Sequence, residues 1–143
     1  VNAPEGTLTL QFFTGTVIVR VDSTTLLDDE TDQADPLTLS NITSGNFLEV
    51  EGIKVDDSLV ASRVVRRDEQ GETILQAPVD RFSAGLDITL LDITFSTAGA
   101  EFADQNDGIL TPELFFNQLQ NGNLVKVSDE DVADGVADTV EFE

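Results

Sequence analysis

The chain has 143 residues, 40% of them apolar, which is enough for a buried core in one ordinary domain or in two very small ones. Its 28 acidic and 7 basic residues give a net charge of −21, which repels nucleic acid phosphates and anionic membrane surfaces. It contains no Cys, His, Met, Trp or Tyr, which excludes disulfides, thiol or histidine catalysis, and metal sites built on Cys or His.

The first half of the chain predicts short strands with an alternating pattern. In residues 16–22, Val17, Val19 and Val21 share one face, and Ile18 and Arg20 share the other. Further strands are predicted over residues 7–13, 46–53 and 58–65. Between them, an acidic loop leads into a short helix that begins at Asp35-Pro36, a cap followed by a first-turn proline, and ends at Gly45.

The second half repeats this order. Strands are predicted over residues 73–82, 86–96, 123–128 and 135–142. The helix begins here at Thr111-Pro112 and ends at Gly122. Compact units of this kind favour a mostly β fold of tandem small barrels of the oligonucleotide/oligosaccharide-binding type, or sandwiches, each with one short helix; a single fused sandwich is the alternative.

Three sequence blocks occur twice, in the same order and 76 or 77 residues apart. We therefore predict two β-units, residues 1–70 and 71–143, joined at "RRDEQGE". The paired blocks are "DPLTLSN" with "TPELFFN", "SGNFLEVEG" with "NGNLVKVSD", and "LVASRVV" with "GVADTVE".

The first unit is predicted to lack its opening strand, because nothing in it corresponds to residues 73–82, "TILQAPVDRF". A missing strand leaves a sheet edge exposed, and exposed edges pair with other strands unless they are protected. One interpretation is that residues 1–9 or the other unit cover this edge. The alternative is that a strand from another subunit fills it by β-strand addition.

The chain resembles a bacterial family catalogued as domain of unknown function 5666, on the stretches "LQAPVDRF", "ITLLDITFS", "GNFLEVEG" with "LVASRVV", and "PELFFNQLQNGNLVKV" with "GVADTV". The resemblance covers nearly all of the chain, the second unit more fully than the first, and its motifs are structural. It implies secreted or lipid-anchored proteins made of small β-barrel repeats, and it supplies no activity and no functional residues. The chain departs from the family in the missing first strand and in having no Cys at the start for a lipid anchor.

The stretch "ADQNDGILTPELFF" resembles a calcium loop that runs into a helix, but it is one residue too short for an EF-hand in either register. A looser cation site remains open, with side-chain oxygens from Asp104, Asn106, Asp107 and Glu113. The alternative is that Asp107-Gly108 forms a turn, Thr111 caps the helix and Glu113 complements the helix dipole.

Other acidic runs raise the same question. At the corresponding place in the first unit, "DDETDQAD" offers Asp28, Asp29 and Asp32 as further candidate ligands, beside Glu30 and Asp35. The last 15 residues hold a third run of acids: Asp129, Glu130, Asp131, Asp134 and Asp138. Such runs are usually solvated loops, yet calcium would relieve the repulsion of a net charge of −21.

Catalysis has few residues to work with. Lys54 and Lys126 both lie in predicted strands, and no Gly-rich phosphate loop is present. The only basic cluster consists of Arg63, Arg66 and Arg67, for which we expect ion pairs with nearby acids on a solvated face. A pair of carboxylates for glycoside hydrolysis stays open, but the aromatic platforms of sugar sites are missing.

We therefore expect a non-enzymatic structural protein that assembles with other copies of itself by β-strand addition at an exposed edge, as a filament or surface subunit. No cofactor is predicted apart from calcium, and neither a nucleic acid partner nor insertion into a membrane is expected. Since the chain starts at Val1 and lacks Met, we expect that a leader was removed and that the protein works in the bacterial periplasm or outside the cell. The alternative function is a monomeric periplasmic or surface-exposed module that binds a small ligand or a cation.

Overall fold

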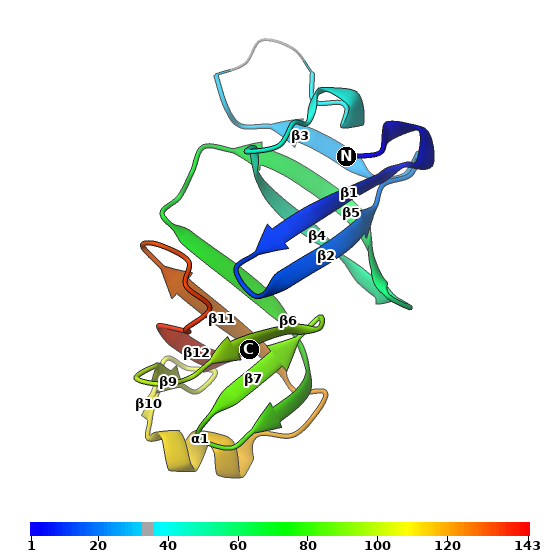
Figure 1. Cartoon of the computed structure of the whole chain (residues 1–143). Coiled ribbons are helices and arrows are strands. Elements are labelled where there is room, and N and C mark those ends of the chain that lie inside the picture. The colour runs from blue at the N-terminus through cyan, green and yellow to red at the C-terminus, as the bar shows by residue number, and fades with distance from the viewer. Residues whose placement is uncertain (33–35) are drawn as a thin grey trace. The chain divides into compact units, whose positions relative to one another are not determined.

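The computed structural model describes residues 1–32 and 36–143, and within them the fold is mostly β, as predicted, with two sheets and one α-helix (Figure 1). The contacts divide the chain into two compact units. The first unit consists of Val1–Gln11 and Thr16–Gln70, and the second consists of Phe12–Gly15 and Gly71–Glu143. No helix of the described residues is long and apolar enough to cross a membrane.

The first unit has five strands built around its last one. On one side β5 pairs antiparallel with β4 over nearly its full length. On the other side β5 pairs in parallel with β2 near its start and with β3 near its end, and β1 pairs with β2. The strands are β1 (Thr7–Phe12), β2 (Gly15–Arg20), β3 (Leu26–Asp29), β4 (Phe47–Val55) and β5 (Ser58–Arg67).

The helix predicted for the first unit is wrong in the part that the structure describes. Asp35, the predicted cap, lies outside the described residues. Between Pro36 and Gly45 the chain forms a 3-10 turn, η2 (Leu39–Asn41), in place of an α-helix. The other 3-10 turn of the described residues, η1 (Ala3–Glu5), lies near the start of the chain. The Asn41 side chain accepts a hydrogen bond from the Thr38 N–H (2.9 Å) and donates one to the Pro36 carbonyl (3.0 Å). These backbone groups are thus hydrogen-bonded by a nearby side chain and not by the backbone of a helix.

The second unit has seven strands in the order β10-β9-β12-β11-β6-β7-β8. Its predicted helix does form: the Thr111 hydroxyl accepts a hydrogen bond from the Leu114 N–H (3.2 Å), and Pro112 opens the first turn. The elements are β6 (Glu72–Ser83), β7 (Asp87–Leu90), β8 (Ile93–Ser96), β9 (Glu101–Ala103), β10 (Ile109–Leu110), α1 (Pro112–Gln118), β11 (Leu124–Glu130) and β12 (Thr139–Phe142).

Buried phenylalanines hold α1 against the second sheet. Phe115 is fully buried and stacks against Phe102 and Phe142, with ring centroids 4.7 and 4.5 Å apart. Phe116 meets the edge of Phe102 at 5.6 Å. The helix ends at Gln118, earlier than the predicted stop at Gly122, and the buried Leu119 comes directly after it.

Two predicted strand boundaries need correction. Residues 86–96 form a hairpin rather than one strand, because Leu91 and Asp92 both take positive φ angles (49° and 60°) and turn the chain between β7 and β8. Asp28 and Asp29, the first residues of the predicted acidic loop, lie in β3. Neither sheet closes on itself as a continuous barrel within the described residues, although an isolated parallel bridge joins Ser96 to Val136.

The two sheets share one pairing pattern. In the first unit Arg20 lies opposite Val60, and Leu27 lies opposite Val64. In the second unit the pairs Ser96–Val136 and Phe102–Val140 occupy the same places, 75 or 76 residues later in the chain. The hairpin β4–β5 thus corresponds to β11–β12, and β1–β2 to β7–β8. The second unit has two further strands: β6, which pairs with both β11 and β7, and the short β10, which pairs with β9.

Candidate functional site

The outer edge of β4 is the feature of the first unit that has no counterpart in the second. One side of β4 pairs with β5, and within residues 1–32 and 36–143 no strand pairs with its other side. The corresponding strand β11 pairs on both sides, with β12 and with β6. Backbone N–H and C=O groups along an unpaired edge can bind another strand.

The apolar residues of β4 are less covered than those of β11. Val125 and Val127 have 0% exposure, with Ala77 and Leu75 of β6 directly opposite them. Leu48 and Val50, which stand 77 residues earlier, are only half-buried. The first unit therefore leaves apolar surface open where the second unit covers it with a strand.

A bulge limits the flat part of this edge. The register of β4 against β5 shifts between Glu51 and Gly52. A Cβ on Gly52 would overlap the carbonyl oxygen of Val60, so the bulge needs glycine. The regular part of the edge is thus residues 47–51, which we call the β4 edge.

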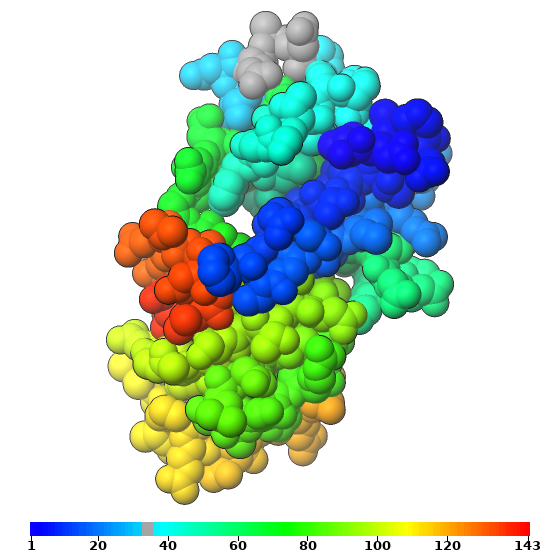
Figure 2. Space-filling model, viewed as in Figure 1, coloured from blue at the N-terminus to red at the C-terminus, as the bar shows by residue number. Residues whose placement is uncertain are grey.

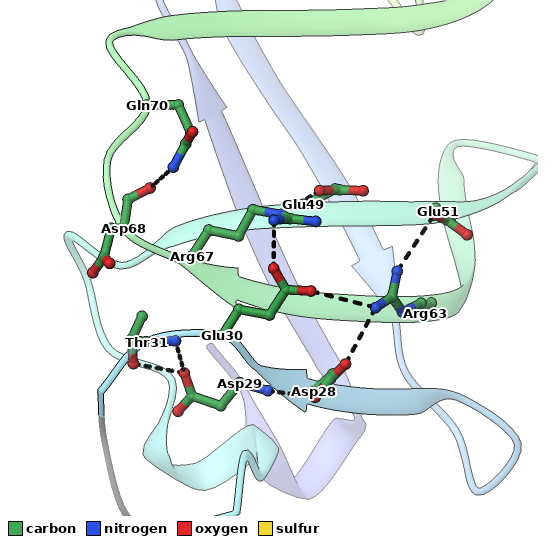
Figure 3. A network of polar contacts seen from close by, with 10 residues as sticks. All are labelled: Asp28, Asp29, Glu30, Thr31, Glu49, Glu51, Arg63, Arg67, Asp68 and Gln70. Atoms are coloured by element: carbon green, nitrogen blue, oxygen red, sulfur yellow. Dashed lines mark hydrogen bonds and ion pairs between the residues drawn. The ribbon is translucent and has the colours of Figure 1, made fainter.

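The acids of the β4 edge are neutralised on the outward face of the sheet (Figure 3). Arg67 pairs with Glu49 and with Glu30, and Arg63 lies 3.8 Å from Glu51. Arg63 also lies 3.2 Å from Asp28. The prediction that the arginine cluster pairs with nearby acids is confirmed: both acids of the β4 edge have an arginine partner, and Arg63 and Arg67 are shared with Asp28 and Glu30 of the neighbouring segment.

The third arginine is not on a solvated face. Arg66 pairs with Asp29, and the two side chains are 4% and 7% exposed. Arg66 also donates to the carbonyl of Asn41 (3.2 Å), and Asp29 accepts from the hydroxyl and the N–H of Thr31 (2.6 and 3.0 Å). The hydrogen bonds from Arg66 and then Thr31 hold the pKa of the Asp29 carboxyl well below its usual value.

The predicted cation loop is held by its own backbone. Asp104 Oδ1 accepts from the N–H groups of Asn106 (2.8 Å) and Gly108 (2.9 Å), which is turn chemistry. Asp107 has a positive φ of 60°, and Glu113 is exposed in the first turn of α1.

The candidate ligands of the first unit are also separated. Asp28 and Asp29 lie in β3 and pair with different arginines, and Asp32 is exposed beyond the strand. Within the described part of the chain, no three acidic side chains come together in a way that could hold a metal ion.

One acid of the last run has a structural role that the sequence does not reveal. Asp129 is 1% exposed and accepts hydrogen bonds from the N–H groups of Asp134 (3.2 Å) and Gly135 (2.9 Å). Asp138 accepts from the N–H of Glu130 (2.7 Å). These carboxylates fold the loop between β11 and β12, so this run is not simply a solvated loop.

An open pocket of about 540 Å³ also lies on the first unit, lined by Glu5, Arg20, Asp22 and Val60 among others. Asp22 is turned toward Thr24, accepting from its hydroxyl (2.6 Å) and its N–H (2.8 Å). These hydrogen bonds lower the pKa of Asp22.

Residues 1–65, which contain the β4 edge, match a family model described as "Domain of unknown function (DUF5666)". The match covers less than half of the 143 residues. The predicted resemblance is thus confirmed from β1 through most of β5, and for the rest of the chain it stays a prediction. No curated protein and no solved structure matches the chain. The DUF5666 description names no activity, so function rests on the site itself.

Proposed function

We propose that this protein is a non-enzymatic, secreted structural subunit whose copies assemble outside a bacterial cell, as a filament or surface layer, by adding a strand to the β4 edge. The observation that carries the proposal is the unpaired β4 edge, whose apolar residues Leu48 and Val50 are half-exposed where the second unit covers Val125 and Val127 with β6. We infer from the shared pairing pattern that the two units arose by duplication, and that the described residues of the first hold no counterpart of β6.

Charge supports this use of the edge. Copies with a net charge of −21 repel each other, so contact is easiest where acids are already paired. Glu49 and Glu51 meet that condition through Arg67 and Arg63. The side chains that remain on the inner face of the β4 edge are apolar and can be buried by an added strand.

Size-exclusion chromatography with light scattering and negative-stain electron microscopy test the proposal. We expect the unmodified chain to form filaments or larger assemblies and Val50→Lys to stay monomeric, because a charge pointing inward from an edge blocks strand addition. Ile109→Lys is the matched control, since Ile109 is 90% exposed on β10 and takes the same change of charge.

Circular dichroism separates loss of pairing from loss of fold. If Val50→Lys does not fold, Val50→Thr keeps the shape of the side chain and still weakens apolar burial. An unmodified chain that remains monomeric under all conditions would contradict the proposal, as would a folded Val50→Lys that assembles as well as Ile109→Lys.

A second candidate function is a monomeric module for a small ligand or a cation, favoured by the open pocket that contains Arg20, Asp22 and Glu5. A monomeric unmodified chain in the same experiment would favour this candidate. It further predicts that Arg20→Ala abolishes the binding of any ligand found by screening, while Val50→Lys does not.

A further inference from the structure

A strand that would fill the β4 edge has a template in the second unit. β6 lies antiparallel to β11, with Ala77 opposite Val125, Gln76 opposite Lys126 and Leu75 opposite Val127. Leu75 and Ala77 are buried there, whereas Gln76 points outward. A segment that pairs with the β4 edge in the same way needs an apolar residue, then a polar residue, then a small apolar residue.

The start of the chain carries that pattern. Val1-Asn2-Ala3-Pro4 repeats Leu75-Gln76-Ala77-Pro78 as an apolar residue, an amide, an alanine and a proline. A proline is tolerated at a sheet edge, and Pro78 stands at the last pair of the β6–β11 register, opposite Leu124.

The segment is also available for exchange. All of Val1–Glu5, the start of the darkest blue segment in Figure 2, is exposed, and Val1 is 58% exposed. It is held by backbone hydrogen bonds between Asn2 and Thr7 (2.7 and 3.1 Å) and by the short turn η1, which contains no buried residue. None of its own side chains is buried, and its backbone groups can form equivalent bonds in a sheet.

We propose that Val1–Pro4 of a second copy adds antiparallel to the β4 edge, with Val1 opposite Val50, Asn2 opposite Glu49 and Ala3 opposite Leu48. This assignment rests on the proposed function, strand addition at the β4 edge, and identifies the segment that supplies the added strand. The segment has no charged side chain before Glu5, so it brings no acid against Glu49. The competing arrangement is antiparallel pairing of β4 with β4 of another copy. When that pairing is centred on Glu49 or Val50, it sets Glu49 opposite Glu49 or Glu51, and like charges directly opposite each other are destabilising.

Donor and acceptor are different surfaces of the same chain. A contact of this kind is heterologous and continues from copy to copy unless a ring closes. The inference therefore accounts for growth into a filament, which a symmetric pairing of two β4 edges does not, because that pairing ends at a dimer.

Cysteine cross-linking in this cysteine-free chain tests the register. The variants Ala3→Cys and Leu48→Cys are made as separate full-length chains, mixed and oxidised. Residues directly opposite in an antiparallel pair have Cα atoms about 4.5–5.5 Å apart, which lies within the range that a disulfide spans. The control mixes Ala3→Cys with Glu49→Cys, whose side chain lies on the other face.

We expect roughly tenfold more disulfide-linked heterodimer from Ala3→Cys with Leu48→Cys than from the control, because a shift of one residue moves a side chain to the opposite face. Deletion of residues 1–5 should abolish assembly and leave the unfolding midpoint nearly unchanged. Equal cross-linking of both mixtures, or undiminished assembly of the deletion variant, overturns the donor assignment.

Val1–Pro4 could also cover the β4 edge of its own chain, and this alternative gives a different result. A double variant Ala3→Cys/Leu48→Cys that forms its disulfide within monomers at high dilution shows that the segment covers its own edge, and that overturns the assignment to a second copy. If the unmodified chain forms filaments but the mixture of Ala3→Cys and Leu48→Cys gives no cross-link, the donor assignment is wrong and the proposed function stands. An unmodified chain that never assembles defeats the proposed function as well.

Discussion

At the scale of single residues, the buried pair of Arg66 and Asp29 differs from the other ion pairs around β5. Arg66→Ala would leave the Asp29 carboxylate among buried neighbours without its strongest partner. The pair of Arg63 with Asp28 is open to water, and such pairs contribute little. We expect Arg66→Ala to lower the midpoint of thermal unfolding clearly more than Arg63→Ala, as measured by differential scanning calorimetry. Equal losses would contradict this.

The same pair predicts a pH dependence. Because Arg66 lowers the pKa of Asp29 from 3.8, the unfolded chain takes up this proton at a higher pH than the folded chain does. The pair's stabilisation is therefore fully present above the unfolded pKa and is lost as the pH falls toward the folded pKa.

Urea unfolding of the unmodified chain and of Asp29→Asn, from about pH 7 to about pH 2.5, measures this effect. The difference in unfolding free energy between them should be constant at higher pH and shrink below pH 3.8. The difference is the relevant quantity, because protonation of other carboxylates changes both chains alike. A difference that does not change down to the lowest pH would show that the pair does not act as described.

At the scale of elements, the two predicted helices show what sequence signals can decide. Both begin with a capping residue and then a proline, yet only α1 forms in the described residues. The two starts are alike, and the difference lies in the residues after the proline. "ELFF" places Phe115 and Phe116 in a core, whereas "LTLSN" offers side chains that bind its own backbone.

The cap of α1 gives a prediction at this scale. Thr111→Ala removes the acceptor for the Leu114 N–H, and we expect a loss of about 1 kcal/mol of unfolding free energy. Thr111→Ser keeps the hydroxyl and should lose much less. Urea denaturation of both variants tests this, and similar losses for the two would mean that the cap bond contributes nothing.

Strand periodicity predicted the sheet-forming stretches well, but not how they pair. The absence of a match to residues 73–82 within residues 1–70 is visible in the sequence, because the repeats can be compared over a spacing of 76 or 77 residues. Three things depend on tertiary contacts and are not visible there. These are the β4 edge as the place left open, the neutralisation of Glu49 and Glu51, and the burial of Asp29, which the sequence presents as one acid in a run.

At the scale of the whole molecule, a net charge of −21 opposes every contact between copies, and the pairing of Glu49 and Glu51 with arginines offsets only part of that repulsion. Salt shortens the range of the repulsion, from about 30 Å at 0.01 M to about 8 Å at 0.15 M. We therefore expect assembly, measured by light scattering, to increase severalfold over this range of NaCl.

Calcium can be separated from screening by comparing CaCl₂ with MgCl₂ at equal ionic strength. The described residues gather no group of three acids fit to hold a metal, so we expect the two salts to promote assembly equally. Val50→Lys should remain monomeric in both, because screening cannot restore a blocked edge. Assembly that needs calcium and is lost in Asp104→Asn/Asp107→Asn would instead place a specific ion at the loop before α1, and the repulsion between copies would then be relieved by binding and not by screening.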